Sequence, residues 1–201
     1  MKIRAYILVV VVLVLFIGSQ ARADSTASRE YQVKAAFLYN FIKFVDWPKE
    51  KTADSNEPII IGIIGNDPFG DAFDAIKDKQ VKDRKIVINR FKGLDELEKS
   101  TEKHPQIEAI RECHLLFICR SEKQNLTETI NLVKDHSVLT VGDMEGFLES
   151  GGIIRFVMEE KKVRFEINVT AAKRAKLKIR SQLLRLAKRV VEEKPSDEAK
   201  S

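Results

Sequence analysis

The chain has 201 residues, of which 44% are hydrophobic and 32% are charged, with 35 lysines and arginines against 30 aspartates and glutamates. This apolar content is ample for a core, and the length fits one domain of ordinary size. Three basic residues (Lys2, Arg4 and Arg22) and no acid lie in the first 23 positions, so 35 against 30 becomes 32 against 30 in the remainder, which gives little support to nucleic-acid binding.

The first 23 residues have the pattern of a cleavable signal peptide. Lys2 and Arg4 form a positive start, residues 5–17 carry no charge, and Ala21-Arg22-Ala23 supplies a small-x-small cleavage pattern. A membrane span needs about 20 apolar residues, and this uncharged run is shorter. We expect cleavage after Ala23 and a mature protein that works outside the cytoplasm; the alternative is an uncleaved N-terminal anchor.

Residues 28–47 predict a helix that ends before Pro48 and is buried on more than one side. Its apolar surface wraps most of the helix and includes six aromatic residues: Tyr31, Phe37, Tyr39, Phe41, Phe44 and Trp47. The simplest interpretation is a core helix, and the alternative is an aromatic surface that faces a partner or ligand.

After a polar linker at 49–57, β-branched apolar runs alternate with segments typical of helices. Strands are expected at residues 59–64, 85–91, 114–119 and 137–141. Helical segments are expected from Asp67-Pro68, across 93–111 with a break near His104-Pro105, from a capping box of Ser121 and Gln124 to about His136, and from a cap at Asp143 to Gly151-Gly152. The apolar run at 59–64 is typical of a central strand covered on both faces.

The pattern then changes to period two, which predicts a β-hairpin from residue 153 to 168. A loop centred on Glu160-Lys161 sets Phe156 opposite Phe165 on one face and Arg155 opposite Glu166 on the other.

The last helix is expected from about Thr170 to Glu193, with a core-facing apolar stripe at spacings of three and four. Residues 171–194 hold nine lysines and arginines and two glutamates. Such a run is most often a solvated face, and it could also meet anionic lipid or an acidic protein surface.

These elements together predict an α/β fold: a three-layer domain with a mainly parallel sheet, an antiparallel edge hairpin and a C-terminal helix. We expect one domain over residues 24–194 and a disordered tail at 195–201.

Cys113 and Cys119 are the only cysteines. An oxidising compartment favours pairing them, but six steps along a strand separate their Cα atoms by about 20 Å, and a disulfide needs less than about 7 Å. Free buried thiols are expected, with a disulfide between molecules as the alternative.

The chain shows few signs of chemistry of its own. His104, His114 and His136 lack metal-ligand spacing, and no nucleophile elbow, phosphate loop or dinucleotide fingerprint occurs, so no metal, cofactor or catalytic residue is expected.

Two places could bind a ligand or a partner. One is the loop at 65–70, which follows a strand and precedes a helix start; its alternative is an ordinary turn. The other is the polar hairpin face formed by Arg155, Arg164, Glu166 and Asn168. There the simplest interpretation is an Arg155–Glu166 salt bridge, and the functional one is an arginine left free for an anionic ligand or partner.

An ordered set of segments resembles the YfiR family of periplasmic regulators, which includes a domain of unknown function described as YfiR-like. These segments are residues 30–48, 113–118, 139–143, 151–154, 164–168 and 183–187, and they span most of the mature chain.

The resemblance implies a soluble periplasmic adaptor rather than an enzyme. Such an adaptor docks on the periplasmic domain of a membrane diguanylate cyclase and keeps it inactive, so that it modulates cyclic-di-GMP signalling and biofilm formation. An outer-membrane lipoprotein can sequester the repressor. A homodimer of the chain is a further possible assembly. Some members are regulated through disulfides, for which this chain has only its two cysteines in one strand. The candidate recognition residues are Arg155, Arg164, Glu166 and Asn168, with Phe147 as a partner-facing aromatic.

Two other functions compete with this regulatory one. The chain could be a periplasmic small-molecule-binding protein with no cyclase partner, using the strand ends around Asn66 and Asp143 as a pocket. It could also be a hydrolase, which would require two convergent acids with strongly raised pKa values in a cleft.

Overall fold

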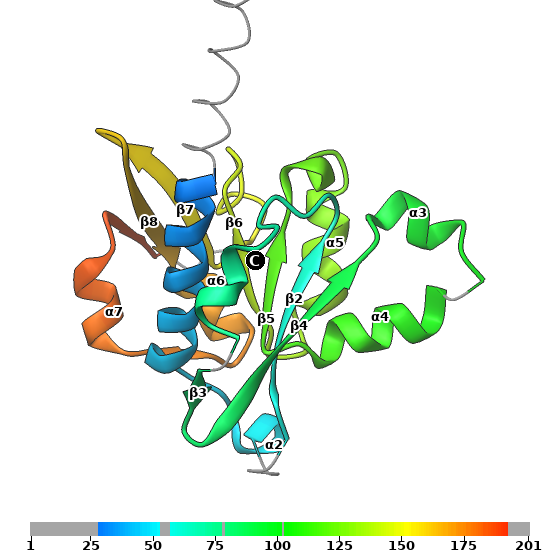
Figure 1. Ribbon diagram of the computed structural model, residues 1–201, viewed down its shortest axis with the longest axis horizontal. Helices are drawn as coiled ribbons and strands as arrows, with labels where there is room; N and C mark the ends of the chain where they lie inside the picture. The colour runs from blue at the N-terminus through cyan, green and yellow to red at the C-terminus, as the bar shows by residue number, and fades with distance from the viewer. Residues whose placement is uncertain (1–27, 53–56, 78, 102, 193–201) are drawn as a thin grey trace, which may run out of the picture.

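The computed structural model describes residues 28–52, 57–77, 79–101 and 103–192 (Figure 1). The predicted signal peptide, its cleavage site, the domain boundaries at 24 and 194, and the predicted tail at 195–201 lie outside these residues. None of the helices in the described ranges is long and apolar enough to cross a membrane.

An eight-stranded sheet forms the centre of the fold, in the order β10-β8-β7-β6-β5-β2-β4-β3. Its strands are β2 (Ile59–Ile64), β3 (Gln80–Val81), β4 (Arg84–Phe91), β5 (Leu115–Ile118), β6 (Leu139–Gly142), β7 (Ile154–Glu159), β8 (Lys162–Asn168) and β10 (Arg189–Val191). The pairs β4–β2, β2–β5, β5–β6, β6–β7 and β8–β10 are parallel, whereas β7–β8 and β3–β4 are antiparallel. A separate antiparallel pair joins β1 (Val45–Asp46) to β9 (Lys178–Ile179).

Helices cover both faces of this sheet (Figure 1). The N-terminal helix (residues 28–44) and the short 3-10 helix η1 (Ala72–Ala75) pack on one face with α6 (Val169–Arg174) and α7 (Ser181–Leu186). On the other face lie α3 (Leu94–Glu98), α4 (Lys103–Glu112) and α5 (Leu126–Val133). The remaining elements are α2 (Lys49–Thr52) and the 3-10 helix η2 (Arg120–Glu122). The predicted fold class is therefore confirmed.

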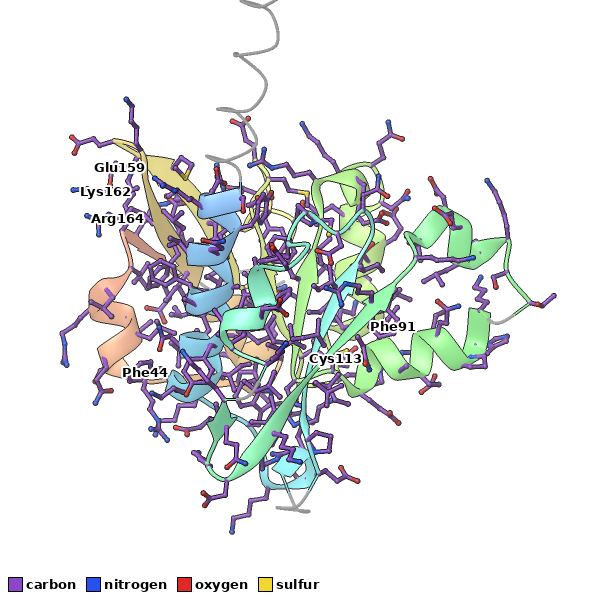
Figure 2. All side chains as sticks on the ribbon, viewed as in Figure 1. Phe44, Phe91, Cys113, Glu159, Lys162 and Arg164 are labelled. Atoms are coloured by element: carbon purple, nitrogen blue, oxygen red, sulfur yellow. The ribbon has the colours of Figure 1, made fainter. Side chains whose placement is uncertain are left out.

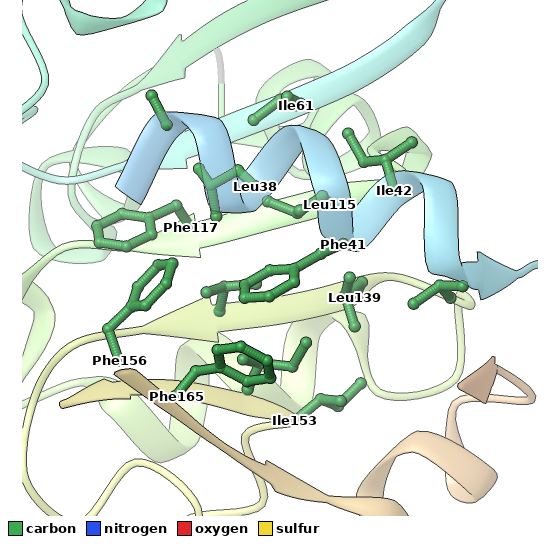
Figure 3. Packing of buried hydrophobic residues seen from close by; sticks show 14 of the residues in the cluster. Leu38, Phe41, Ile42, Ile61, Leu115, Phe117, Leu139, Ile153, Phe156 and Phe165 are labelled. Carbon is green, nitrogen blue, oxygen red and sulfur yellow. The ribbon is translucent and has the colours of Figure 1, made fainter. Parts of the chain in front are cut away.

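The N-terminal helix inserts its apolar stripe into the larger of two hydrophobic clusters (Figure 3). Phe41 stacks on Phe156 at 5.6 Å between ring centroids and meets Phe165 edge-on at 5.0 Å. Because these rings come from the helix and both hairpin strands, their packing joins the N-terminal helix to the hairpin.

The hairpin has the predicted register. Phe156 lies opposite Phe165, and Arg155 lies opposite Glu166. The two-residue turn places both Glu160 and Lys161 at positive φ (48° and 61°), as a turn matched to the twist of the strands requires.

The predicted last helix is wrong in its extent. In place of one helix over 170–193, the structure has α6, then β9, then α7, then strand β10, which lies outside β8. Tertiary contacts divide it: Arg180 binds the Asp46 carboxylate with Nη2–Oδ1 at 2.6 Å, and its backbone N–H donates to the Phe44 carbonyl at 2.9 Å. These bonds hold the chain extended beside β1, where a helix could not pair with it.

Three of the predicted helix caps also differ. Asp67 Oδ1 accepts from the backbone N–H of Phe69 at 2.8 Å, a local turn that precedes the 3-10 helix η1 rather than an α-helix. Ser121 lies in η2, and α5 begins only after Asn125. Residues 144–151 form turns rather than a helix capped by Asp143, because that carboxylate binds side chains described below.

Candidate functional site

A cluster of ionisable side chains lies where β5 and β6 end and the N-terminal helix begins. Arg120 follows β5 by two residues, and Asp143 comes directly after β6. Since these strands are parallel neighbours, their carboxyl ends meet at one edge of the sheet. Glu30, Tyr31 and Lys34 reach the same place from the helix. We call these five residues the edge cluster.

Lys34 is the centre of the edge cluster and is 1% exposed. Its Nζ lies 2.5 Å from Asp143 Oδ2 and 2.5 Å from Glu30 Oε1, one helical turn away. The ammonium group also sits 4.2 Å from the centroid of the Tyr31 ring. A buried lysine in a water-excluded site is stabilised by such pairing with two carboxylates and an aromatic face.

Asp143 receives three donors. Besides Lys34, the Tyr31 hydroxyl donates to Oδ2 at 3.0 Å and Arg120 Nε donates to Oδ1 at 3.0 Å. Burial alone would raise the pKa of Asp143, but the charges and hydrogen bonds of Lys34 and Arg120 lower it below its usual value. Burial, with the Asp143 charge beside it, raises the pKa of Tyr31, so the phenol keeps its proton.

The edge cluster therefore clamps the N-terminal helix to the sheet. The Asp143 carboxylate and the Lys34 ammonium are both bound by neighbours, and neither is a free acid or base. Arg120 is the exposed member, since its side chain is 63% accessible and could reach a partner.

The pocket at the strand ends around Asn66 and Asp143 stays a prediction. Neither residue lines five of the cavities among the described residues, whose volumes are about 240 to 460 Å³. Asn66 donates its backbone N–H to Ser121 Oγ at 3.0 Å, and Arg90 Nε donates to Asp67 Oδ2 at 2.6 Å, so these contacts tie the loop at 65–70 to its neighbours. In the described ranges, no group of three histidine, cysteine or acidic side chains could hold a metal ion.

The prediction that Phe147 faces a partner is wrong, because its side chain is 0% exposed. The ring packs against the backbone at Gly142 and Gly152. A Cβ at either position would come within 2.4 Å and 2.2 Å of ring atoms, respectively. Two glycines at this spacing around an aromatic residue were the available signal for a buried ring.

Asn168 is also a structural residue. Its side chain is buried, accepts from the backbone N–H of Ala171 at 2.9 Å to cap α6, and donates to the Leu148 carbonyl at 3.2 Å. The predicted role of Asn168 in recognition is therefore wrong.

The other three predicted residues, Arg155, Arg164 and Glu166, lie on the hairpin but have different surroundings. Glu166 is bound in a two-point contact by Arg189 of β10, with Nε–Oε1 at 3.1 Å and Nη2–Oε2 at 2.9 Å. Arg155 lies opposite Glu166, yet its nearest guanidinium nitrogen is 3.9 Å from that carboxylate. The predicted Arg155–Glu166 salt bridge is thus the weaker of two, and the stronger one involves a residue that had been placed in a helix.

The two hairpin arginines differ in their exposure. Arg155 Nε is buried without a hydrogen-bond partner among the described residues. Arg164 is exposed and projects from the hairpin with Lys162 and Glu159 (Figure 2).

Both cysteines are buried free thiols, and they belong to hydrophobic clusters on opposite faces of the sheet. Burial raises the pKa of Cys113 to about 12, and its thiol donates to the Ala109 carbonyl at 3.3 Å. Burial and three nearby carboxylates also raise the pKa of Cys119. Neither thiol is poised to act as a nucleophile.

Sequence reasoning missed the edge cluster, although one signal was present. Lys34 falls on the stripe of Leu38, Phe41 and Val45, at helical spacings of four, three and four, and this stripe is buried. A lysine among core positions must be paired, but nothing in the sequence identifies its partner 109 residues away.

Comparison with known proteins gives a family match over most of the chain. A family model described as YfiR/HmsC-like matches residues 31–188. No curated protein matches the sequence. Among solved structures, a conserved domain protein from Vibrio cholerae aligns with a TM-score of 0.49 and 11% identity, over 66% of this chain. The chain spans about half (54%) of that protein's length.

Proposed function

Because the chain belongs to the YfiR/HmsC-like family, whose members regulate cyclic-di-GMP signalling, we propose that it is a periplasmic adaptor that represses a membrane-bound diguanylate cyclase. Repression works through contact with the periplasmic domain of the cyclase, without chemistry of the adaptor's own. The observation that carries this proposal is the family match, which runs from the N-terminal helix to the residue before β10. An outer-membrane lipoprotein that sequesters the adaptor belongs to the same proposal.

The hairpin end of the sheet is the surface best suited to this contact. Arg164 is exposed there, and the side chain of Arg155 on the same face is 23% exposed. Large exposed apolar side chains lie on the opposite face of the sheet, that of Phe165: Met158 (49%), Val190 (44%) and, on α7, Leu186 (64%). Arginine anchors contribute strongly to interface energetics, so the arginine face suits an acidic partner.

A repressor of this kind must bind the inactive state of the cyclase better than the active one. A preference of about 2.7 kcal/mol shifts that equilibrium a hundredfold. One or two buried anchors supply that much.

Reversing the charge of Arg164 tests the proposal. Because the side chain is exposed, Arg164→Glu should leave the melting temperature nearly unchanged while it weakens the cyclase contact. Cyclic-di-GMP and biofilm should then rise toward the level of a gene deletion. Lys85→Glu makes the same charge change at an exposed position of β4, near the opposite edge of the sheet, and should keep repression. Unchanged cyclic-di-GMP in the deletion strain, with its cyclases expressed, would rule out repression.

Export is tested separately. Mass spectrometry of the natively expressed protein should show an N-terminus at Asp24, because the signal peptidase cleaves after the small-x-small pattern. Membrane-bound protein that retains Met1 would contradict this expectation.

A further inference from the structure

A cavity of about 240 Å³ lies at the amino edge of the sheet, opposite the edge cluster. It is formed where the N-terminal helix ends and β2, β4 and β5 begin. Four of its lining residues are buried and aliphatic: Ile42, Val45, Ile59 and Val81. The polar lining consists of Asp46, Trp47, Lys82, Arg84 and His114.

Arg84 is a buried cation with no anionic partner among the described residues. Its residue is 8% exposed. Nε donates to the Glu57 carbonyl at 2.6 Å, and Nη2 lies 3.4 Å from the Pro58 carbonyl and 3.1 Å from His114 Nε2. No carboxylate of the described residues lies within ion-pair distance of Arg84, in contrast to Arg180 and Arg189. Burial of a charge without a counter-ion is costly, so the site favours an anion.

Trp47 offers a second unused donor at the same cavity. Its Nε1 is buried and, within the described part of the chain, has no hydrogen-bond acceptor. Its ring meets the His114 ring edge-on at 5.9 Å. Buried indole N–H groups normally donate to an acceptor, so a bound ligand with an acceptor atom would satisfy Trp47 Nε1.

The other polar groups of the lining limit which charge a ligand can carry. Burial, helped by the charges of Arg84 and Lys51, lowers the pKa of His114 to about 4, so the imidazole is neutral near pH 7. Asp46, the carboxylate of the lining, is already bound by Arg180 at 2.6 Å and lies 3.8 Å from Lys82. Among the described residues, the lining therefore offers an unpaired buried guanidinium, that of Arg84, and no free carboxylate for an ammonium group.

We propose that this cavity binds a small apolar molecule that carries a single carboxylate. The carboxylate is recognised by Arg84 and the Trp47 indole N–H, and the apolar body packs on the four aliphatic side chains. A single unpaired guanidinium suits a monoanion, and the small volume with an aliphatic lining suits a short chain or a single ring. This site is independent of the cyclase contact and lies apart from the strand-end pocket considered above.

Binding is measured by calorimetry and thermal shift on the mature chain at pH 7, with hexanoate and 3-phenylpropionate as probes. At least one probe should bind and raise the melting temperature, because a ligand that binds only the folded state stabilises it. Two matched compounds share the ring of the second probe. 3-Phenylpropanamide lacks the charge, and phenylalanine adds an ammonium group, so each should bind at least tenfold more weakly than 3-phenylpropionate. Absence of binding by both carboxylates at millimolar concentration, or equal binding of the amide, overturns the proposal.

Two substitutions test whether Arg84 and the Trp47 indole N–H bind the carboxylate. Trp47→Phe keeps an aromatic ring but removes the N–H, and it should weaken carboxylate binding about tenfold. Arg84→Gln should abolish it, and Arg90→Gln is its control because Arg90 pairs with Asp67 at the other end of the sheet. Should Arg84→Gln fail to fold, Trp47→Phe decides. Wild-type affinity in the folded variants counts against the proposal.

Discussion

Replacement of Lys34 by methionine is expected to destabilise the fold by about 3 kcal/mol. The change leaves Asp143, whose side chain is 2% exposed, without its buried counter-ion. Removal of one partner of a buried ion pair typically costs about 3–5 kcal/mol. We place Lys34→Met at the lower end because Arg120 and Tyr31 still donate to the Asp143 carboxylate.

Urea denaturation of the mature chain measures this loss, with Lys43→Met as the control. Lys43 is an exposed lysine of the same helix, so its replacement should change the unfolding free energy by less than about 0.5 kcal/mol. The double variant Lys34→Met with Asp143→Leu removes both buried charges. It should be more stable than the sum of the two single changes predicts, since the residues are in contact. Equal losses for Lys34→Met and Lys43→Met would show that the edge cluster does not clamp the helix.

Mild acid is expected to destabilise the protein through His114. Burial, with the positive charges of Arg84 and Lys51, lowers the pKa of this histidine from 6.5 to about 4 in the folded state. Between these two pH values the unfolded chain binds the proton and the folded chain does not, so stability falls as the pH falls from 6.5 to 4. The full shift corresponds to about 3 kcal/mol.

The test is the free energy of unfolding at several pH values between 7 and 4. His114→Gln should flatten this profile, even if it shifts stability as a whole, because the titrating group is gone. His104→Gln, at an exposed histidine, should keep the wild-type slope. If His114→Gln retains the full acid sensitivity, another group is responsible and the assignment to His114 is wrong.

Periodic features were readable from the sequence because each of them is local. The apolar run at 59–64 is strand β2, and its bounds agree. Alternation at period two predicted both the hairpin and the pairing of Phe156 with Phe165, since a shift by one residue would turn every apolar side chain outward. Strand and helix alternation likewise led to the correct fold class.

Which charged residues meet was decided only by the tertiary structure. Lys34 and Asp143 lie 109 residues apart, and Asp46 and Arg180 lie 134 apart. The Asp46–Arg180 pair helps to keep the chain extended at β9, within a segment whose apolar spacing predicted a helix. Long-range pairing there outweighs the local helix propensity. Because the helix is divided, Arg189 lies in strand β10, where it binds Glu166 more closely than Arg155 does. Periodicity is a property of neighbours along the chain and shows which face of an element is buried. The partner of a buried charge depends on how separate elements pack, and no local pattern records it.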